Sequence, residues 1–243
     1  MGAPLFLTAE LPTGGRYRLD GPEGHHAATV QRLRPGEILL LGNGAGDLAR
    51  CRVTGAGKGA LDLAVLERWT EPESRPKLTV VQGIAKGDRG ELAVQAMTEV
   101  GVDTIVPWSA TRSVARWKGE RGQKSLERWR SVAREAGKQA RRAWQPVVTS
   151  PMDTGEACEL IEAATAAYLL HEQASQPLAT VDLPPTGEIV LVVGPEGGVT
   201  PEETAGFSTA GAVVARLGCS VLRTSTAGVA ALSVVSARSG RWS

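Results

Sequence analysis

One stretch of the chain combines a strand, a glycine-rich loop and a helix start in a way that suits ligand binding. Residues 191–203 read LVVGPEGGVTPEE, with an apolar run ahead of the Gly-Pro-Glu-Gly-Gly loop. Thr200, Pro201 and Glu203 have the types and spacing of an N-cap, a first helical residue and the acid of a capping box. Glycines let a backbone approach a ligand closely, and open α/β sheets bind ligands at the carboxyl ends of their strands. The pattern predicts a binding loop that includes Glu196, whereas a plain tight turn would explain only the glycines.

A second loop of the same kind follows near the end of the chain. Residues 217–227 read LGCSVLRTSTA and lie between a strand-like run and a helix of small residues at 228–237. Thr224 or Ser225 is expected to cap that helix. The two loops together predict one shared site, although a buried terminal helix would account for the second pattern alone.

Positive charge is concentrated between Arg112 and Gln145. This segment holds eleven Lys or Arg against three Glu, an excess of +8, and since the whole chain carries +1 the remainder carries −7. Such asymmetry favours one basic surface and a polyanionic partner, while a solvated helix face is the alternative. Four cations recur every fourth residue, at Arg130, Arg134, Lys138 and Arg142, about 6 Å apart along a helix. The apolar stripe of the same helix is predicted at Leu126, Trp129, Val132, Ala136 and Ala140.

Two domains are expected to position these motifs. Short β-like runs are expected at residues 37–41, 48–53 and 61–66, separated by glycine-rich turns, which is typical of a small antiparallel barrel. The turn at residues 42–46 lacks the Lys-Ser/Thr ending of a phosphate loop and is interpreted as a hairpin turn. Residues 71–76 have linker composition, so the domains are placed at residues 1–72 and 77–243.

The second domain alternates strands and helices. Strands are predicted at residues 78–84, 104–108, 168–171, 189–193 and 213–217, and helices at 90–100 and 124–143. Apolar strands separated by helices predict a parallel sheet with helices on both faces, an α/β fold.

Composition excludes several other classes of protein. Of the 243 residues, 42% are hydrophobic and 22% are charged, the ordinary range of a folded globular protein. Cys51, Cys158 and Cys219 are odd in number and have no CxxC spacing, so neither a disulfide framework nor a metal site is expected. No run of 18 apolar residues and no secretion signal is present, and we therefore expect a cytoplasmic protein without a membrane partner.

These motifs resemble the SPOUT class of methyltransferases, and more closely its small-subunit (16S) rRNA uridine N3-methyltransferase family. The resemblance covers most of the chain. It is carried by residues 24–36, 86–102, 111–113, 134–142, 169–172, 194–198 and 217–224. Two positions depart from the family pattern: Gln95-Ala96 replaces Gln-Lys, and Thr224-Ser225-Thr226-Ala227 replaces Thr-Glu-Thr-Ala.

The resemblance implies an N-terminal PUA-like β-barrel, a C-terminal α/β domain with a deep trefoil knot, a homodimer, and S-adenosylmethionine as cofactor. The implied cofactor-binding residues are Leu170, His171, Glu172, Gly194, Pro195, Glu196, Gly197, Gly198, Leu217, Gly218, Val221, Leu222, Arg223, Thr224 and Thr226. The implied substrate is 16S rRNA, in the context of the small ribosomal subunit. The candidate RNA contacts are His25, Arg32, Arg34, Arg112, Arg134, Lys138, Arg141 and Arg142, with a surface or capping role as the alternative for His25 and His26.

Methylation of uridine N3 requires loss of a weakly acidic proton and alignment of the nitrogen with a methyl donor. A cation beside O2 or O4 would stabilise the uridine anion, and Arg112 and Arg223 are the candidates for that role. Glu196 is the candidate for orienting the cofactor or accepting a proton. Two alternatives remain: a methyltransferase for ribose 2'-hydroxyl or guanine N1, and a non-catalytic RNA-binding factor in ribosome assembly. An NAD-dependent enzyme is disfavoured, because no GxGxxG opens a helix after a strand.

Overall fold

The computed structural model describes residues 2–242, which form two compact units. The first unit contains the chain up to Glu73 together with Gly137–Gln145, and the second contains Ser74–Ala136 and the chain from Pro146 onward. Residues 137–145 were expected in the second domain. They pack instead in the first unit, a long-range arrangement that local sequence patterns do not encode.

The first unit is built on a mostly antiparallel sheet. Its strands lie in the order β1 (Leu5–Leu7), β3 (Ile38–Gly42), β4 (Asp47–Gly57), β5 (Ala60–Thr70) and β2 (Arg16–Leu19), and β1 pairs in parallel with β3. Helix α1 (Gly21–His25) and a π-helix (His26–Val30) follow β2. The turn between β3 and β4 is a hairpin turn, as predicted. Gly44 and Gly46 there have φ angles of 75° and 95°, which favour glycine.

Residues 137–145 contribute to the core of the first unit. Ala143 is buried in a cluster with Leu5, Leu7 and Leu48. Its carbonyl oxygen accepts a hydrogen bond of 3.1 Å from the N–H of Gly46. This segment therefore completes the sheet packing of a unit whose other residues all precede Ser74.

The second unit contains a parallel sheet, as the alternating pattern predicted. Its strands lie in the order β10 (Gln176–Pro177), β12 (Val213–Arg216), β9 (Ala166–Leu170), β11 (Glu188–Val193), β6 (Lys77–Gly83), β7 (Thr104–Trp108) and β8 (Val147–Val148). Each pairing in this order is parallel. The carboxyl ends of β6, β9, β11 and β12 therefore meet at one edge of the sheet.

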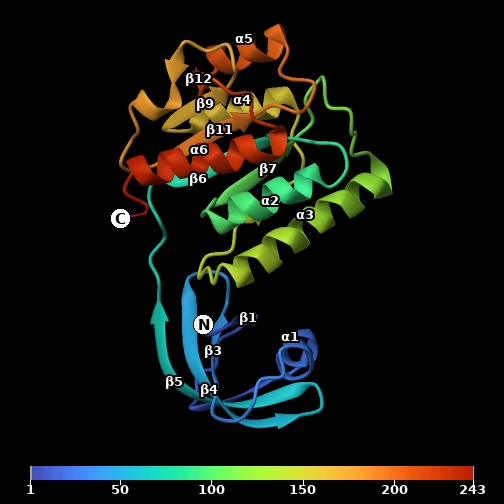
Figure 1. The fold of residues 1–243 in the computed structure, drawn as a ribbon, viewed down its shortest axis with the longest axis vertical. Coiled ribbons are helices and arrows are strands. Elements are labelled where there is room, and N and C mark those ends of the chain that lie inside the picture. Colours follow the sequence, from blue (N-terminus) through green and yellow to red (C-terminus); the bar gives the residue numbers. More distant parts are fainter. Residues whose placement is uncertain (1, 243) are drawn as a thin grey trace. The chain divides into compact units, whose positions relative to one another are not determined.

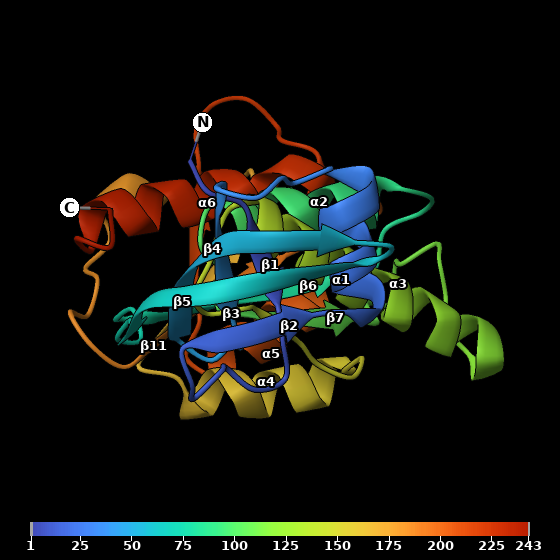
Figure 2. The ribbon, with the colours of Figure 1, turned by 90° about the horizontal axis from the view of Figure 1, so that it is seen from below.

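Helices cover both faces of this sheet (Figures 1 and 2). Helices α2 (Arg89–Glu99) and α6 (Thr224–Arg238) and the first part of α3 (Gly119–Gln139) bury residues such as Met97, Leu126 and Leu232 against one face. Helices α4 (Thr154–Ala163) and α5 (Pro201–Thr209) cover the other face with Ile161 and Phe207. A 3-10 helix (Leu178–Thr180) follows β10. The arrangement is an α/β sandwich of three layers.

Helix α3 begins five residues earlier and ends four residues earlier than the predicted span of 124–143. Leu126, Trp129 and Ala136 are buried, as its apolar period predicted, but Ala140 is exposed. The helix has ended before Ala140, and Arg141 takes a left-handed φ of 54°, a conformation that stops a helix.

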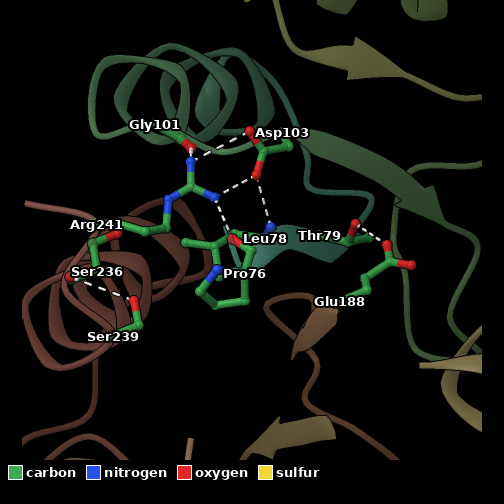
Figure 3. A network of polar contacts seen from close by, with 9 residues as sticks. All are labelled: Pro76, Leu78, Thr79, Gly101, Asp103, Glu188, Ser236, Ser239 and Arg241. Atoms are coloured by element: carbon green, nitrogen blue, oxygen red, sulfur yellow. Dashed lines mark hydrogen bonds and ion pairs between the residues drawn. The ribbon is translucent and has the colours of Figure 1, made fainter. Parts of the chain in front are cut away.

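Arg241, which follows α6, bonds to residues near the starts of β6 and β7 (Figure 3). Arg241 donates hydrogen bonds to the carbonyl oxygens of Pro76 and Gly101 at 2.7 and 2.8 Å, and forms an ion pair of 2.5 Å with Asp103. Asp103 also accepts a hydrogen bond of 2.8 Å from the N–H of Leu78. The network joins the start of β6, the loop before β7 and the residues after α6.

Within residues 2–242, none of the helices combines the length and apolar character needed to cross a membrane.

Candidate cofactor-binding site

A pocket of about 500 Å³ lies at the carboxyl ends of the parallel strands in the second unit. It brings together the loops after β9 and β11 and the segment before α6. Of the predicted site residues it is lined by Arg112, Leu170, His171, Glu172, Gly194, Pro195, Glu196, Gly197, Gly198, Val221, Leu222, Arg223 and Thr224. A smaller adjoining hollow of about 80 Å³ adds Leu217 and Gly218. Thr226 lines neither pocket, and its hydroxyl donates to the carbonyl oxygen of Arg223 at 3.2 Å.

The loop at 194–198 is held by close backbone packing and by the helix that follows. A Cβ on Gly197 would lie 2.7 Å from the carbonyl oxygen of Arg112, and one on Gly83 would lie 2.5 Å from the backbone nitrogen of Pro195. Both positions therefore require glycine. The predicted capping box is present, because Thr200 accepts from the N–H of Glu203 and Glu203 accepts from the N–H of Thr200. The loop is thereby fixed at both ends.

The second loop is tied to the first by Thr224. Its hydroxyl donates to the carbonyl oxygen of Gly194 at 2.8 Å and accepts from Nε2 of Gln82 at 2.9 Å. The prediction that Thr224 or Ser225 caps α6 was wrong. The N-cap is Arg223, without a side-chain capping bond, because the Thr224 hydroxyl is engaged across the sheet edge. Gln82, a buried polar residue near the end of β6, was missed by sequence reasoning.

Glu196 lies at the rim of the pocket and is paired. Its Oε1 accepts a hydrogen bond of 3.1 Å from the N–H of Lys86 and forms an ion pair of 3.3 Å with Arg89. Arg89, which also lines the pocket, was not among the predicted site residues. The available signal was its place in the first turn of α2, shortly after β6.

The pocket is lined by both cationic and anionic side chains. Arg112 and Arg223 are both exposed, and Nη1 of Arg112 donates to the carbonyl oxygen of Gly197 at 3.4 Å. Arg89 also lines the pocket, and Glu172 and Glu196 add two carboxylates to the same lining. Such a lining offers partners to a ligand that carries both cationic and anionic groups.

Comparisons with known proteins give the family. The profile of an RNA methyltransferase domain matches residues 72–236, and that of an RNA methyltransferase PUA domain matches residues 19–66. The chain is 48% identical to the ribosomal RNA small subunit methyltransferase E of Mycobacterium bovis, over 100% of this chain and 94% of that protein. The chain belongs to the SPOUT-class family of small-subunit rRNA methyltransferases. The Bacillus subtilis member is 29% identical, over 93% of this chain and 91% of that protein.

Two solved structures resemble the protein over nearly its whole length. The Neisseria gonorrhoeae ribosomal RNA small subunit methyltransferase E, bound to S-adenosyl methionine, is 29% identical with a TM-score of 0.85, and the match covers 98% of each chain. A putative methyltransferase of Legionella pneumophila, in complex with the same cofactor, is 27% identical with a TM-score of 0.86, again over 98% of each chain. The family match supports the PUA-like fold of the first unit.

The basic residues predicted to contact RNA in this family member do not form one exposed ladder. Lys138 is only 5% exposed and forms an ion pair of 2.9 Å with Glu23, both in the first unit. This corrects its prediction as a surface contact, since burial and pairing withdraw its ammonium from solvent. Arg130 is half-buried and bonded to the carbonyl oxygen of Val148 at 3.2 Å. The remaining candidates are exposed or, for Arg142, partly exposed: His25, Arg32, Arg34, Arg112, Arg134, Arg141 and Arg142.

The first unit has a cavity of its own, of about 540 Å³, beside two of these candidates. Lys138 and Arg141 line it together with His26, Gln31 and Glu37. His25, the residue proposed from the sequence, is exposed on α1 and is not among the lining residues. Among the described residues no group of three His, Cys, Asp or Glu side chains is placed to hold a metal ion.

Proposed function

We propose that the protein transfers a methyl group from S-adenosylmethionine to N3 of a uridine in 16S rRNA of the small ribosomal subunit. The observation that supports this most directly is the pocket of about 500 Å³ between the loops at 194–198 and 221–224. A cavity of this volume suits a cofactor-sized molecule. Relatives of known structure, 29% and 27% identical over nearly the whole chain, hold S-adenosylmethionine.

The residues present fit this cofactor. The two loops line the pocket in which the cofactor is proposed to bind. Gly197 lets its loop pack directly against the backbone of Arg112, because a Cβ there would collide with it. When bound, S-adenosylmethionine supplies the sulfonium methyl group that is transferred. We assign Glu196 an orienting role rather than that of proton acceptor, since its carboxylate is bonded to the N–H of Lys86 and paired with Arg89.

Arg112 and Arg223 act on the uridine in this proposal. Loss of the N3 proton leaves negative charge shared with O2 and O4, and a guanidinium beside either oxygen stabilises it. Replacement of either arginine by alanine should lower the single-turnover rate by about 100-fold. The salt dependence of RNA binding should stay nearly unchanged in both variants, because neither side chain is assigned to phosphate.

The first unit is proposed to hold RNA through exposed cations such as Arg141, in keeping with its PUA-like fold. We further propose a trefoil knot in the second unit, a homodimer and a cytoplasmic location, as the family resemblance implies. Sedimentation at micromolar concentration should report about twice the chain mass of 25.5 kDa, as a closed symmetric dimer requires. A fully active monomer would contradict the dimer.

The decisive experiment maps methylated nucleotides in 16S rRNA from cells with and without the protein. The proposal expects one uridine whose N3 methylation disappears with the protein and returns with the purified protein and S-adenosylmethionine. A lost methyl group on ribose 2'-hydroxyl or guanine N1 would move the activity to that target. Unchanged modification, with no binding of S-adenosylmethionine, would instead support a non-catalytic assembly factor.

A further inference from the structure

We propose that Glu203 is a positioning residue for methyl transfer, which holds the segment 109–113 so that Arg112 faces the cofactor pocket. This inference rests on the role proposed above for Arg112. Glu203 itself lies on the first turn of α5 and is not among the lining residues.

Glu203 uses its two carboxylate oxygens for different tasks. Oε2 accepts a hydrogen bond of 2.9 Å from the N–H of Thr200, which completes the capping box of α5. Oε1 accepts a hydrogen bond of 2.7 Å from the N–H of Thr111 and another of 3.3 Å from the hydroxyl of Thr154. One side chain therefore joins α5, the segment after β7 and the start of α4.

The helix cap alone does not explain this arrangement. In α4, Glu156 occupies the same place in a capping box and accepts from the N–H of Asp153 at 2.8 Å, yet Glu156 is exposed. Glu203 is only 4% exposed. Burying a carboxylate is costly unless several donors compensate, so the burial indicates a task beyond capping.

That task concerns the backbone on either side of Arg112. The N–H of Thr111 is held by Glu203, and the N–H of Ser113 donates to the carbonyl oxygen of Ala110 at 3.0 Å. Between them, the carbonyl oxygen and Cβ of Arg112 lie against Gly197, at 2.7 and 2.8 Å from where a Cβ on that glycine would stand. A long exposed side chain has many rotamers, so fixing its backbone narrows the positions its guanidinium can reach.

The electrostatics agree with a carboxylate that is ionised at neutral pH. Burial raises the pKa of Glu203. Hydrogen bonds lower it by more than burial raises it, so the net pKa is below its ordinary value. The donors are the backbone N–H groups of Thr111 and Thr200 and the hydroxyls of Thr111 and Thr154. An ionised carboxylate forms stronger hydrogen bonds to N–H groups than a neutral amide does. Thr154 extends the network, since its hydroxyl accepts from Nε1 of Trp108 at the end of β7.

The test compares Glu203→Gln with Glu156→Gln, which alters the equivalent residue of the other capping box. In full-length protein with saturating S-adenosylmethionine and small-subunit rRNA, Glu203→Gln should lower the single-turnover rate about tenfold or more. Its cofactor dissociation constant should stay within about twofold of the parent. Backbone hydrogen exchange at residues 109–113 should accelerate in Glu203→Gln and stay at the parent level in Glu156→Gln. This measurement does not depend on whether rRNA is the substrate.

A double-mutant cycle separates this role from general stabilisation. If Glu203 acts through Arg112, Glu203→Gln should lower the rate no further in an Arg112→Ala background. Fully additive effects of the two substitutions on the rate would overturn the inference. A single-turnover rate or a hydrogen-exchange rate in Glu203→Gln equal to that of the parent would overturn it as well. If Arg112→Ala itself kept the parent rate, the proposed role of Arg112 would fall, and the inference with it. Should Glu203→Gln not fold, Glu203→Asp keeps the charge but is one methylene shorter, and the same outcomes apply to it.

Discussion

The hydroxyl of Thr224 donates a hydrogen bond of 2.8 Å to the carbonyl oxygen of Gly194, across 30 positions of sequence. This bond joins the two loops that were predicted from separate sequence patterns. Nε2 of Gln82, near the end of β6, donates a second hydrogen bond of 2.9 Å to the same hydroxyl. The pocket therefore depends on a contact that neither loop can make alone.

Replacement of Thr224 by Val should weaken S-adenosylmethionine binding about tenfold. The variant keeps the shape of the side chain but removes the link to Gly194 and takes an acceptor from the buried Gln82 amide, a loss of about 1–3 kcal/mol. Thr226→Val is the matched control, since Thr226 is exposed, lines neither pocket and bonds back to the carbonyl oxygen of Arg223. Calorimetry that found equal affinities in the two variants would contradict the prediction.

Gly197→Val should abolish cofactor binding. The new side chain would meet the carbonyl oxygen and Cβ of Arg112, at 2.7 and 2.8 Å from its Cβ, and would push the loop at 194–198 away from its neighbour. Gly14→Val serves as control, because a Cβ there meets nothing within 4 Å. Parent affinity for S-adenosylmethionine in the Gly197 variant would remove this loop from the cofactor site.

Arg241→Ala should destabilise the second unit by about 3–5 kcal/mol, because it removes a largely buried guanidinium that pairs with the largely buried carboxylate of Asp103. Figure 3 shows that three further backbone groups also depend on these two residues. Arg238 is an exposed arginine with one bond of 3.1 Å to the carbonyl oxygen of Leu178. Arg238→Ala should therefore cost less than about 1 kcal/mol. Urea unfolding, monitored by a probe in each unit, measures the free energy of unfolding of both variants. Equal losses of stability in Arg241→Ala and Arg238→Ala would contradict the prediction.

Arg141→Ala and Lys138→Ala should separate RNA binding from stability within one segment. Arg141 is exposed, so its loss should reduce the slope of RNA affinity against salt by about 0.7 to 0.9. Lys138 is buried with Glu23, so its loss should destabilise the first unit by about 3 kcal/mol. Filter binding across a salt series and thermal unfolding give the two readouts. An unchanged slope in Arg141→Ala would make that residue part of a solvated surface.

The stability contributed by Glu203 should depend on pH in one direction. Its folded-state pKa is lowered, so it is ionised in the folded protein to lower pH than in the unfolded chain, where its ordinary value is 4.5. Its contribution is complete above that value and is lost as the pH falls through the lower folded-state pKa. The difference in melting temperature between the parent and Glu203→Gln should stay constant above about pH 5 and shrink below about pH 4.5. A constant difference down to about pH 3 would refute it.

Local signals predicted the parts of the site that depend on local chemistry. Thr200, Pro201 and Glu203 define a helix start by side-chain type and spacing alone, and buried parallel strands have a recognisable apolar run. Arg89 and Gln82 escaped prediction because their importance comes from strands and loops brought together by the sheet. Lys138 was misassigned for a related reason. Helical period shows which residues share a face, but it does not show that another part of the chain covers that face.

The first unit has a discontinuous chain, because its core includes Ala143 alongside Leu5, Leu7 and Leu48. A chain leaving the ribosome delivers residues 1–73 first, then two strands, one helix and most of a second helix of the other unit, and only then this alanine. The first unit thus cannot complete its packing as the first product of translation. A fragment that ends at residues 71–76 would lack Ala143, so Leu5, Leu7 and Leu48 would lose a buried packing partner.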